Sequence, residues 1–233
     1  PQFNMTMTIR VRIFLLLLVS VLAASVAQAH NVSAEDIALI SGRSGFDFLL
    51  YLWLGAKHMV TGYDHILFLL GVIFYLTGMR SVALYVTLFA VGHSLTLIFG
   101  VLNGINVNPY FIDGIIGLSV AYKAFDNLGG FDSVLGWTPD DRWATFIFGL
   151  FHGLGLATKL QDLGLSEDGL LPNLLSFNVG VELGQIAALS VLLVLLVFWR
   201  RADSEQRFGV PFNFVILACG FALASWQFMH MVL

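Results

Sequence analysis

The sequence has 233 residues, of which 58% are hydrophobic and 11% are charged, and its mean hydropathy is +0.85. These values exclude an ordinary soluble surface and indicate a protein that resides in lipid. The net charge of -4 contains no basic block, which argues against nucleic acid as a partner, and the single cysteine, Cys219, excludes a disulfide framework and a cysteine-based metal site.

Residues 1–29 have the pattern of a cleavable secretory signal peptide, because two arginines precede a short apolar run and an Ala-x-Ala site ends at Ala29. The alternative is an uncleaved first helix. Cleavage after Ala29 would make His30 the first mature residue, and its α-amine and imidazole can then act together as an N-terminal metal ligand. The simpler interpretation is that His30 merely follows the cleavage site.

The rest of the chain divides into a short outer segment and a membrane domain. Residues 30–61 are expected to form a periplasmic segment, in which the apolar run 46–54 lies at the membrane interface or extends the first span. The membrane domain covers 62–231, with spans expected at 62–79, 81–103, 110–127, 142–160, 171–199 and 210–231. The sequence therefore predicts an all-α, polytopic transmembrane helical bundle, with about six spans after a cleaved signal peptide.

Basic residues set the expected orientation. Secretion places the mature N-terminus in the periplasm, so the connections near Arg80, at 128–141 and at 200–209 are expected in the cytoplasm. The cations on or near that side outnumber those outside, as the positive-inside rule requires. They are Arg80, Lys123, Arg142, Arg200, Arg201 and Arg207 inside, against Arg43, Lys57 and Lys159 outside. This pattern predicts a multi-pass protein of the bacterial inner membrane.

Several polar residues lie in apolar segments, where a charged group costs at least about 2.5–3.5 kcal/mol and therefore needs a partner or a purpose. The candidate metal ligands among them are His58, Asp64, His65, His93, His152 and Glu182, and the supporting polar groups are Ser94, Asp113, Asn178 and Gln185. His58 and His65 would share one face of an unbroken helix, although Gly62 between them loosens this geometry. Asn178, Glu182 and Gln185 follow the spacing i, i+4, i+7, which is a single helical stripe.

The residue types limit the chemistry. A lone intramembrane histidine is often just an interhelical hydrogen-bonding group, but four histidines with two carboxylates on four apolar helices are hard to explain as independent packing residues. Imidazole combined with carboxylate suits Ni, Co, Cu, Zn or Fe, whereas Mg and Ca prefer oxygen ligands. Asp64 and Glu182 would balance the charge of the ion. A proton relay through the same groups is the main rival.

Two motifs resemble the signatures of the HupE/UreJ family, which is associated with nickel or cobalt uptake around hydrogenase and urease maturation. They are His58-x5-Asp64-His65 and Phe151-His152-Gly153. Segments 92–97 and 177–185 are similar to the second branch of that family. The resemblance implies a permease of six to eight spans, in which His58, Asp64, His65 and His152 handle the metal.

The chain departs from the better-studied branch, which continues the Phe-His-Gly element with a second histidine and a glutamate. Leu156 and Lys159 stand at those places here. Glu182 and His93 could substitute for the two lost ligands from neighbouring helices.

The sequence thus predicts a permease for a divalent transition metal, with nickel or cobalt first and copper, zinc or iron as alternatives. Its expected partners are the lipid bilayer, the metal ion, and either metalloenzyme maturation proteins or further copies of the chain.

Two other classes of function stay open. A metal-dependent intramembrane hydrolase would use a histidine-bound zinc, or Ser94 as nucleophile with His152 as base, although Gly-His-Ser-Leu-Thr does not follow the Gly-x-Ser-x-Gly pattern. A membrane protein that binds haem or metal without transport would use the histidines as ligands.

Overall fold

The computed structural model describes residues 34–40, 43–76, 78–162, 166–201 and 204–233. The predicted signal peptide and His30 lie outside these residues. Every regular element within the described ranges is an α-helix, which confirms the predicted all-α class.

Nine helices lie within the described residues: α2 (Ala34–Ile40), α3 (Phe48–Thr61), α4 (Tyr63–Ile73), α5 (Met79–Leu102), α6 (Pro109–Asn127), α7 (Gly130–Leu135), α8 (Asp141–Asp162), α9 (Leu170–Arg201) and α10 (Ser204–Val232). Each of the six segments predicted to be a span overlaps one of them. The segment 62–79 differs most, because α4 ends at Ile73. The short helix α2 lies in the expected periplasmic segment and α7 lies in the expected connection 128–141, and neither was predicted to be a helix.

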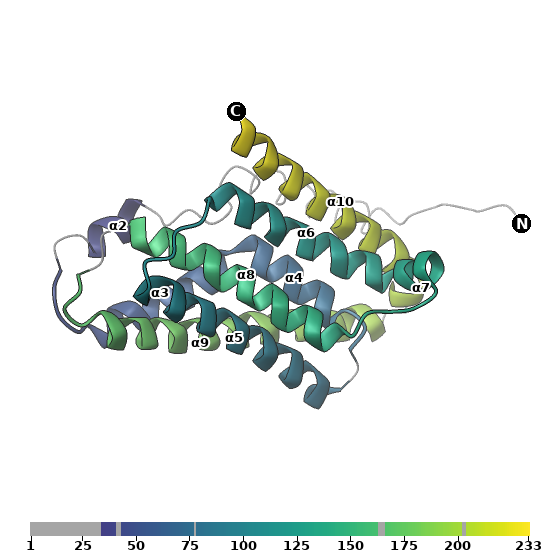
Figure 1. Cartoon of the computed structure of the whole chain (residues 1–233). Helices are drawn as coiled ribbons and strands as arrows, with labels where there is room; N and C mark the ends of the chain where they lie inside the picture. The colour runs from purple at the N-terminus through teal and green to yellow at the C-terminus, as the bar shows by residue number, and fades with distance from the viewer. Residues whose placement is uncertain (1–33, 41–42, 77, 163–165, 202–203) are drawn as a thin grey trace, which may run out of the picture.

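Three pairs of helices pack very closely: α5 with α8, α6 with α10, and α3 with α9 (Figure 1). Glycines permit this approach in each pair. A Cβ atom on Gly153 would lie 2.0 Å from the carbonyl oxygen of His93, one on Gly180 would lie 2.0 Å from that of Leu52, and one on Gly117 would lie 2.6 Å from the backbone nitrogen of Ala224. Small residues at a contact let two helix backbones approach, which is the usual way that membrane helices associate.

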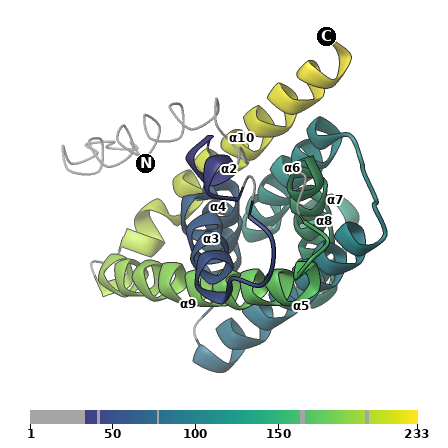
Figure 2. The same ribbon diagram turned by 90° about the vertical axis from the view of Figure 1, so that its left-hand side faces the viewer.

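Helix α4 lies inside the bundle, where it contacts α3, α5, α6, α9 and α10 (Figure 2). Arg200 of α9 binds carbonyl groups at the end of α4 and just after it: its Nη1 donates to Leu76 O at 3.0 Å, and its Nη2 donates to Phe74 O and, at 3.5 Å, to Ile73 O. Asn127 at the end of α6 donates to Gly71 O at 2.8 Å. The short helix therefore depends on side chains from its neighbours to satisfy its C-terminal carbonyls.

The outer surface of the bundle is apolar, and its interior holds several polar side chains among the apolar ones. Exposed large side chains include Leu95 and Phe99 on α5, Ile186 on α9 and Phe221 on α10, whereas His93 is fully buried. Soluble proteins rarely expose so many large apolar side chains, so this distribution fits a surface that faces lipid.

Three helical segments are long and apolar enough to cross a membrane: Met79–Leu102, Leu170–Arg200 and Phe208–Val232. Helices α6 and α8 have 19 and 22 residues, enough to span about 28–33 Å. They carry more charge, but part of it lies in ion pairs, because Lys159 binds Asp113 and Lys123 binds Asp126 and Asp141. The chain is a helical membrane protein, and the count of six spans stays a prediction.

Candidate metal site

The first part of the site is the turn at Gly62, which separates α3 from α4. The backbone of Gly62 is extended, with φ of -74° and ψ of 97°, and its N–H donates to His58 O at 2.9 Å. His58 and His65 therefore lie on two helices rather than on one face of a continuous helix. Their rings nevertheless meet edge to face, with centroids 5.1 Å apart. The break brings together the two histidines that a straight helix would have stacked two turns apart.

His93 of α5 completes a group of three histidines, which we call the three-histidine group: His58, His65 and His93. One ring nitrogen from each lies within 4.8 Å of the others. Nitrogens that share one transition-metal ion at about 2.0–2.1 Å lie up to about 4 Å apart. Small rotations of the rings would therefore bring the three nitrogens onto one ion.

Asp64 fixes the orientation of His65. The Asp64 Oδ1 atom lies 3.0 Å from His65 Nδ1 and also accepts the backbone N–H of His65 at 2.9 Å. A hydrogen bond from Nδ1 to a carboxylate leaves Nε2 as the nitrogen with the lone pair, which is the form that binds a metal. Asp64 thus supplies negative charge to the site and sets the tautomer of one of its histidines.

His93 is the clearest ligand candidate. Its side chain is 0% exposed, and neither ring nitrogen has a hydrogen-bond partner among the residues that the structure describes. Buried polar atoms are nearly always hydrogen-bonded, because an unmet one costs about 1–3 kcal/mol. Two unmet nitrogens beside two further histidines fit a side chain that is kept for a ligand.

His152 of α8 lies against this group and is also fully buried. Its ring centroid is 4.8 Å from that of His65, and Phe89 packs on it at 4.9 Å. Its Nε2 lies 3.4 Å from the hydroxyl of Ser119 on α6. The hydroxyl neighbour of His152 is therefore Ser119, whereas Ser94 lines a groove between α5 and α9. No sequence motif marks Ser119, whose one signal is a small polar residue within an apolar run.

The remaining predicted residues occupy other places. Glu182 is exposed in the groove that Ser94 lines and is not among the residues that converge with the three-histidine group. Asp113 binds Lys159 Nζ at 2.8 Å. Asn178 and Gln185 are buried on α9, and neither Nε2 nor Oε1 of Gln185 has a hydrogen-bond partner in the described parts of the chain. Of the ten predicted site residues that are described, His58, Asp64, His65, His93 and His152 come together.

This arrangement has a definite chemical capacity. It offers several imidazoles and one carboxylate in a buried position, which is a set that suits divalent transition metals better than Mg or Ca. The aromatic rings of Phe68 and Phe89 pack on the His152 ring and form an apolar wall of the site. Apolar walls of this kind exclude water and so strengthen the attraction between a cation and its ligands.

The chain matches the family model described as HupE / UreJ protein over residues 34–230. No curated protein and no solved structure shows significant similarity to it. The matched region contains all of α2 to α9 and both histidine motifs, together with His93 and the polar residues of α9. The chain therefore belongs to the HupE/UreJ family.

Proposed function

We propose that this protein is a permease that carries a divalent transition metal ion across the bacterial inner membrane. Proteins of the HupE/UreJ family are membrane proteins associated with nickel and cobalt transport. Nickel and cobalt are therefore the first candidates, while copper, zinc and iron(II) are also compatible with imidazole and carboxylate ligands.

The observation that carries the proposal is the environment of His93. This histidine is fully buried in an apolar helix, and both ring nitrogens lack hydrogen-bond partners among the described residues. Its nearest titratable neighbours include His58 and His65, whose ligand nitrogens lie within 4.8 Å. A proton relay would be expected to join its members through hydrogen bonds, whereas a metal site leaves its ligand nitrogens open.

The cargo would exchange its hydration water for the imidazoles of the three-histidine group, with Asp64 balancing part of the charge. Binding must be favourable enough for the ion to enter and weak enough for it to leave. Because only neutral imidazole binds a metal, uptake should fall as the pH is lowered and protons compete for the ring nitrogens.

The proposed orientation places the N-terminal segment in the periplasm, so that the ion would move inward past α2. Metalloenzyme maturation proteins on the cytoplasmic side, or further copies of the chain, are the proposed partners. Both proposals follow from the distribution of basic residues and from the family.

The test is uptake of Ni, Co, Cu, Zn and Fe(II) by proteoliposomes, read by elemental analysis. We expect wild-type protein to accumulate one of these ions and His93→Ala to lose that activity. His230→Ala is the matched control, because His230 lies near the end of α10 and contacts Trp226 and Tyr110. Stoichiometric binding of metal without any uptake would replace the permease with a metal-binding membrane protein that does not transport.

A further inference from the structure

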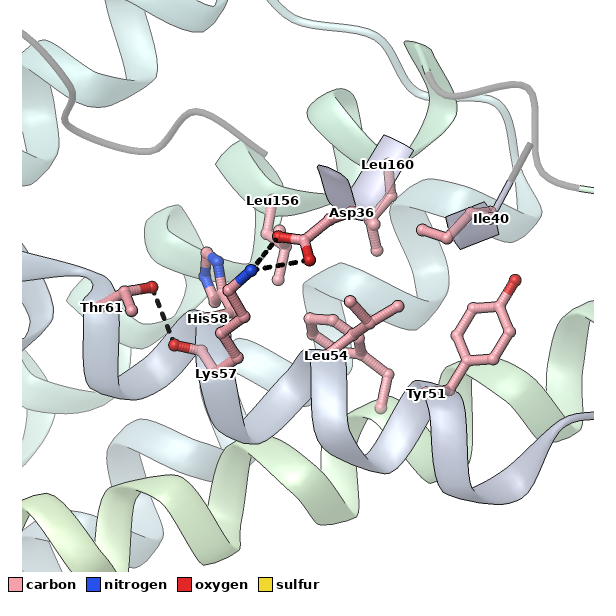
Figure 3. Close-up of a pocket in the computed structure, with 10 residues that line it drawn as sticks. Asp36, Ile40, Tyr51, Leu54, Lys57, His58, Thr61, Leu156 and Leu160 are labelled. Carbon is pink, nitrogen blue, oxygen red and sulfur yellow. Dashed lines mark hydrogen bonds and ion pairs between the residues drawn. The ribbon is translucent and has the colours of Figure 1, made fainter. Parts of the chain in front are cut away.

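A small cavity lies beside His58, on the side where α2 approaches the bundle (Figure 3). It has a volume of about 50 Å³, which is room for a few water molecules. Its wall is apolar on one side, through residues such as Leu156 and Phe177. Its polar residues include Asp36, Lys57, His58 and Thr61. The cavity therefore combines a ligand of the three-histidine group with a carboxylate from the N-terminal segment.

Asp36 and Lys57 form an ion pair at this cavity. Lys57 Nζ lies 2.8 Å from one carboxylate oxygen of Asp36 and 2.9 Å from the other (Figure 3). The Asp36 side chain is 11% exposed and that of Lys57 is 29% exposed. Both oxygens of a largely buried carboxylate are thus directed at one cation, which is how a carboxylate also binds a metal ion in bidentate fashion.

The pair also attaches α2 to the bundle. This helix has seven residues, far fewer than an isolated helix needs to be stable in water. Asp36 and Ile40 are buried side chains of α2, and both line the cavity. A buried ion pair is weak evidence for stability, because desolvation of the charges offsets most of their attraction. Stability alone therefore does not account for the pair, which lies at the same cavity as His58.

We propose that Asp36 and His58 form an outer cation subsite, in which an incoming divalent transition metal ion takes the place of the Lys57 ammonium before it reaches the three-histidine group. The inference rests on the proposed permease function. Lys57 is the residue that precedes His58 in α3, so its ammonium is a tethered cation that occupies the carboxylate while no metal is there. The metal must displace it, which makes the lysine a competitor for the subsite.

This competition predicts effects of opposite sign. Asp36→Asn removes the carboxylate and should raise the apparent KM for metal uptake by about tenfold, the scale on which metal affinity depends on a nearby carboxylate. Lys57→Met removes the competing cation, keeps most of the side-chain volume, and should lower the KM. The maximal rate should change little in either variant, because the three-histidine group is intact.

The experiment measures initial uptake rates in proteoliposomes against the concentration of the metal that wild-type protein carries. Glu35→Gln is the matched control, since Glu35 is an exposed acid on the same short helix and should leave the KM unchanged. Thermal unfolding of each variant in detergent is followed alongside. Lys57→Met and the double variant Asp36→Asn/Lys57→Met keep the test decisive if Asp36→Asn alone does not fold.

The outcomes separate three cases. A purely structural ion pair would make both single variants less stable and shift uptake in the same direction, which would overturn the outer subsite. Unchanged KM values in both variants, with normal wild-type uptake, would also overturn it while the permease proposal stands. Absence of uptake by wild-type protein would overturn the permease proposal itself.

Discussion

Gly62 joins α3 to α4 at the point where His58 and His65 meet, and space rather than backbone conformation requires a glycine there. Its φ of -74° is open to any residue. A Cβ atom at this position would lie 2.6 Å from His65 Nδ1 and 3.3 Å from Asp64 Oδ1. These are the two atoms whose contact orients the His65 ring, so an added methyl group would have to displace one of them.

We expect Gly62→Ala to weaken metal binding strongly while the helical content of the protein stays the same. The His65 ring would rotate away from Asp64, and the nitrogens of the three-histidine group would no longer converge. Metal binding by purified protein, followed by titration calorimetry, measures the effect. Gly78→Ala is the control, because the nearest atom to its added Cβ is Ser81 Oγ at 3.9 Å. Equal affinities in the two variants would refute the account of Gly62.

Asp64 acts on the metal through His65 as well as by its charge. Replacing it with asparagine keeps the shape of the side chain and removes the carboxylate that fixes the ring. Loss of such a partner typically costs about 10–100-fold in metal affinity, and we expect Asp64→Asn to fall in this range. Asp132→Asn, at an exposed position on α7, should bind metal as the wild type does. An Asp64→Asn protein with wild-type affinity would exclude Asp64 from the site.

At the scale of the element, α4 carries Asp64 and His65 of the site, and it is too short to hold itself in place. It has 11 residues, and its C-terminal carbonyls lie inside the bundle. Arg200 reaches them from the far end of α9 and donates to Leu76 O and Phe74 O. A cation at a helix C-terminus also interacts favourably with the helix dipole. The long helix α9 therefore positions the short one.

We expect Arg200→Ala to reduce the stability of the protein by about 2 kcal/mol, since hydrogen bonds from a charged donor contribute about 1.5–3 kcal/mol. Thermal unfolding in detergent, followed by circular dichroism, should show a lower midpoint. Arg80→Ala removes an exposed arginine from the beginning of α5 and is the matched control. If both variants melt at the wild-type temperature, Arg200 does not anchor α4.

At the scale of the whole molecule, the bundle buries polar groups within an apolar core and has an apolar outer surface. His65, His93, His152 and the Asp113–Lys159 pair lie inside, while α5, α9 and α10 present large apolar side chains outward. Charged residues make helices α6 and α8 less apolar than α5, α9 and α10. Ion pairs within the bundle would allow both to cross the membrane in spite of this charge.

The topology can be measured with a thiol reagent that does not cross membranes. In a Cys219→Ser background, Ser133→Cys labels the connection after α6, and Leu233→Cys labels the C-terminus. Three helices, α8, α9 and α10, lie between these positions, so the two thiols should be on opposite sides of the membrane. In right-side-out spheroplasts we expect Leu233→Cys to react directly and Ser133→Cys to react only after permeabilisation. Reaction of both on one side would show that these three helices do not all span the membrane.

The sequence by itself determined the helical class, the approximate ends of the main helices and the two histidine motifs. The length of an apolar run is a local property, so the segments from 81–103 to 210–231 agree with α5, α6, α8, α9 and α10 to within a few residues, apart from the earlier start of α10. His58, His65 and His152 could be identified because each stands in a recognisable motif within apolar chain.

The tertiary structure alone decided which of these residues meet. Glycine contacts such as that of Gly153 with the backbone of His93 set the distance and rotation of α5 against α8, and no pattern within a single helix contains that information. They bring His93 into the three-histidine group, whereas Glu182 lies exposed in the groove between α5 and α9. The pairing of Asp36 with Lys57 joins positions 21 residues apart on two helices. It exists only because the chain folds α2 back over the cavity beside His58.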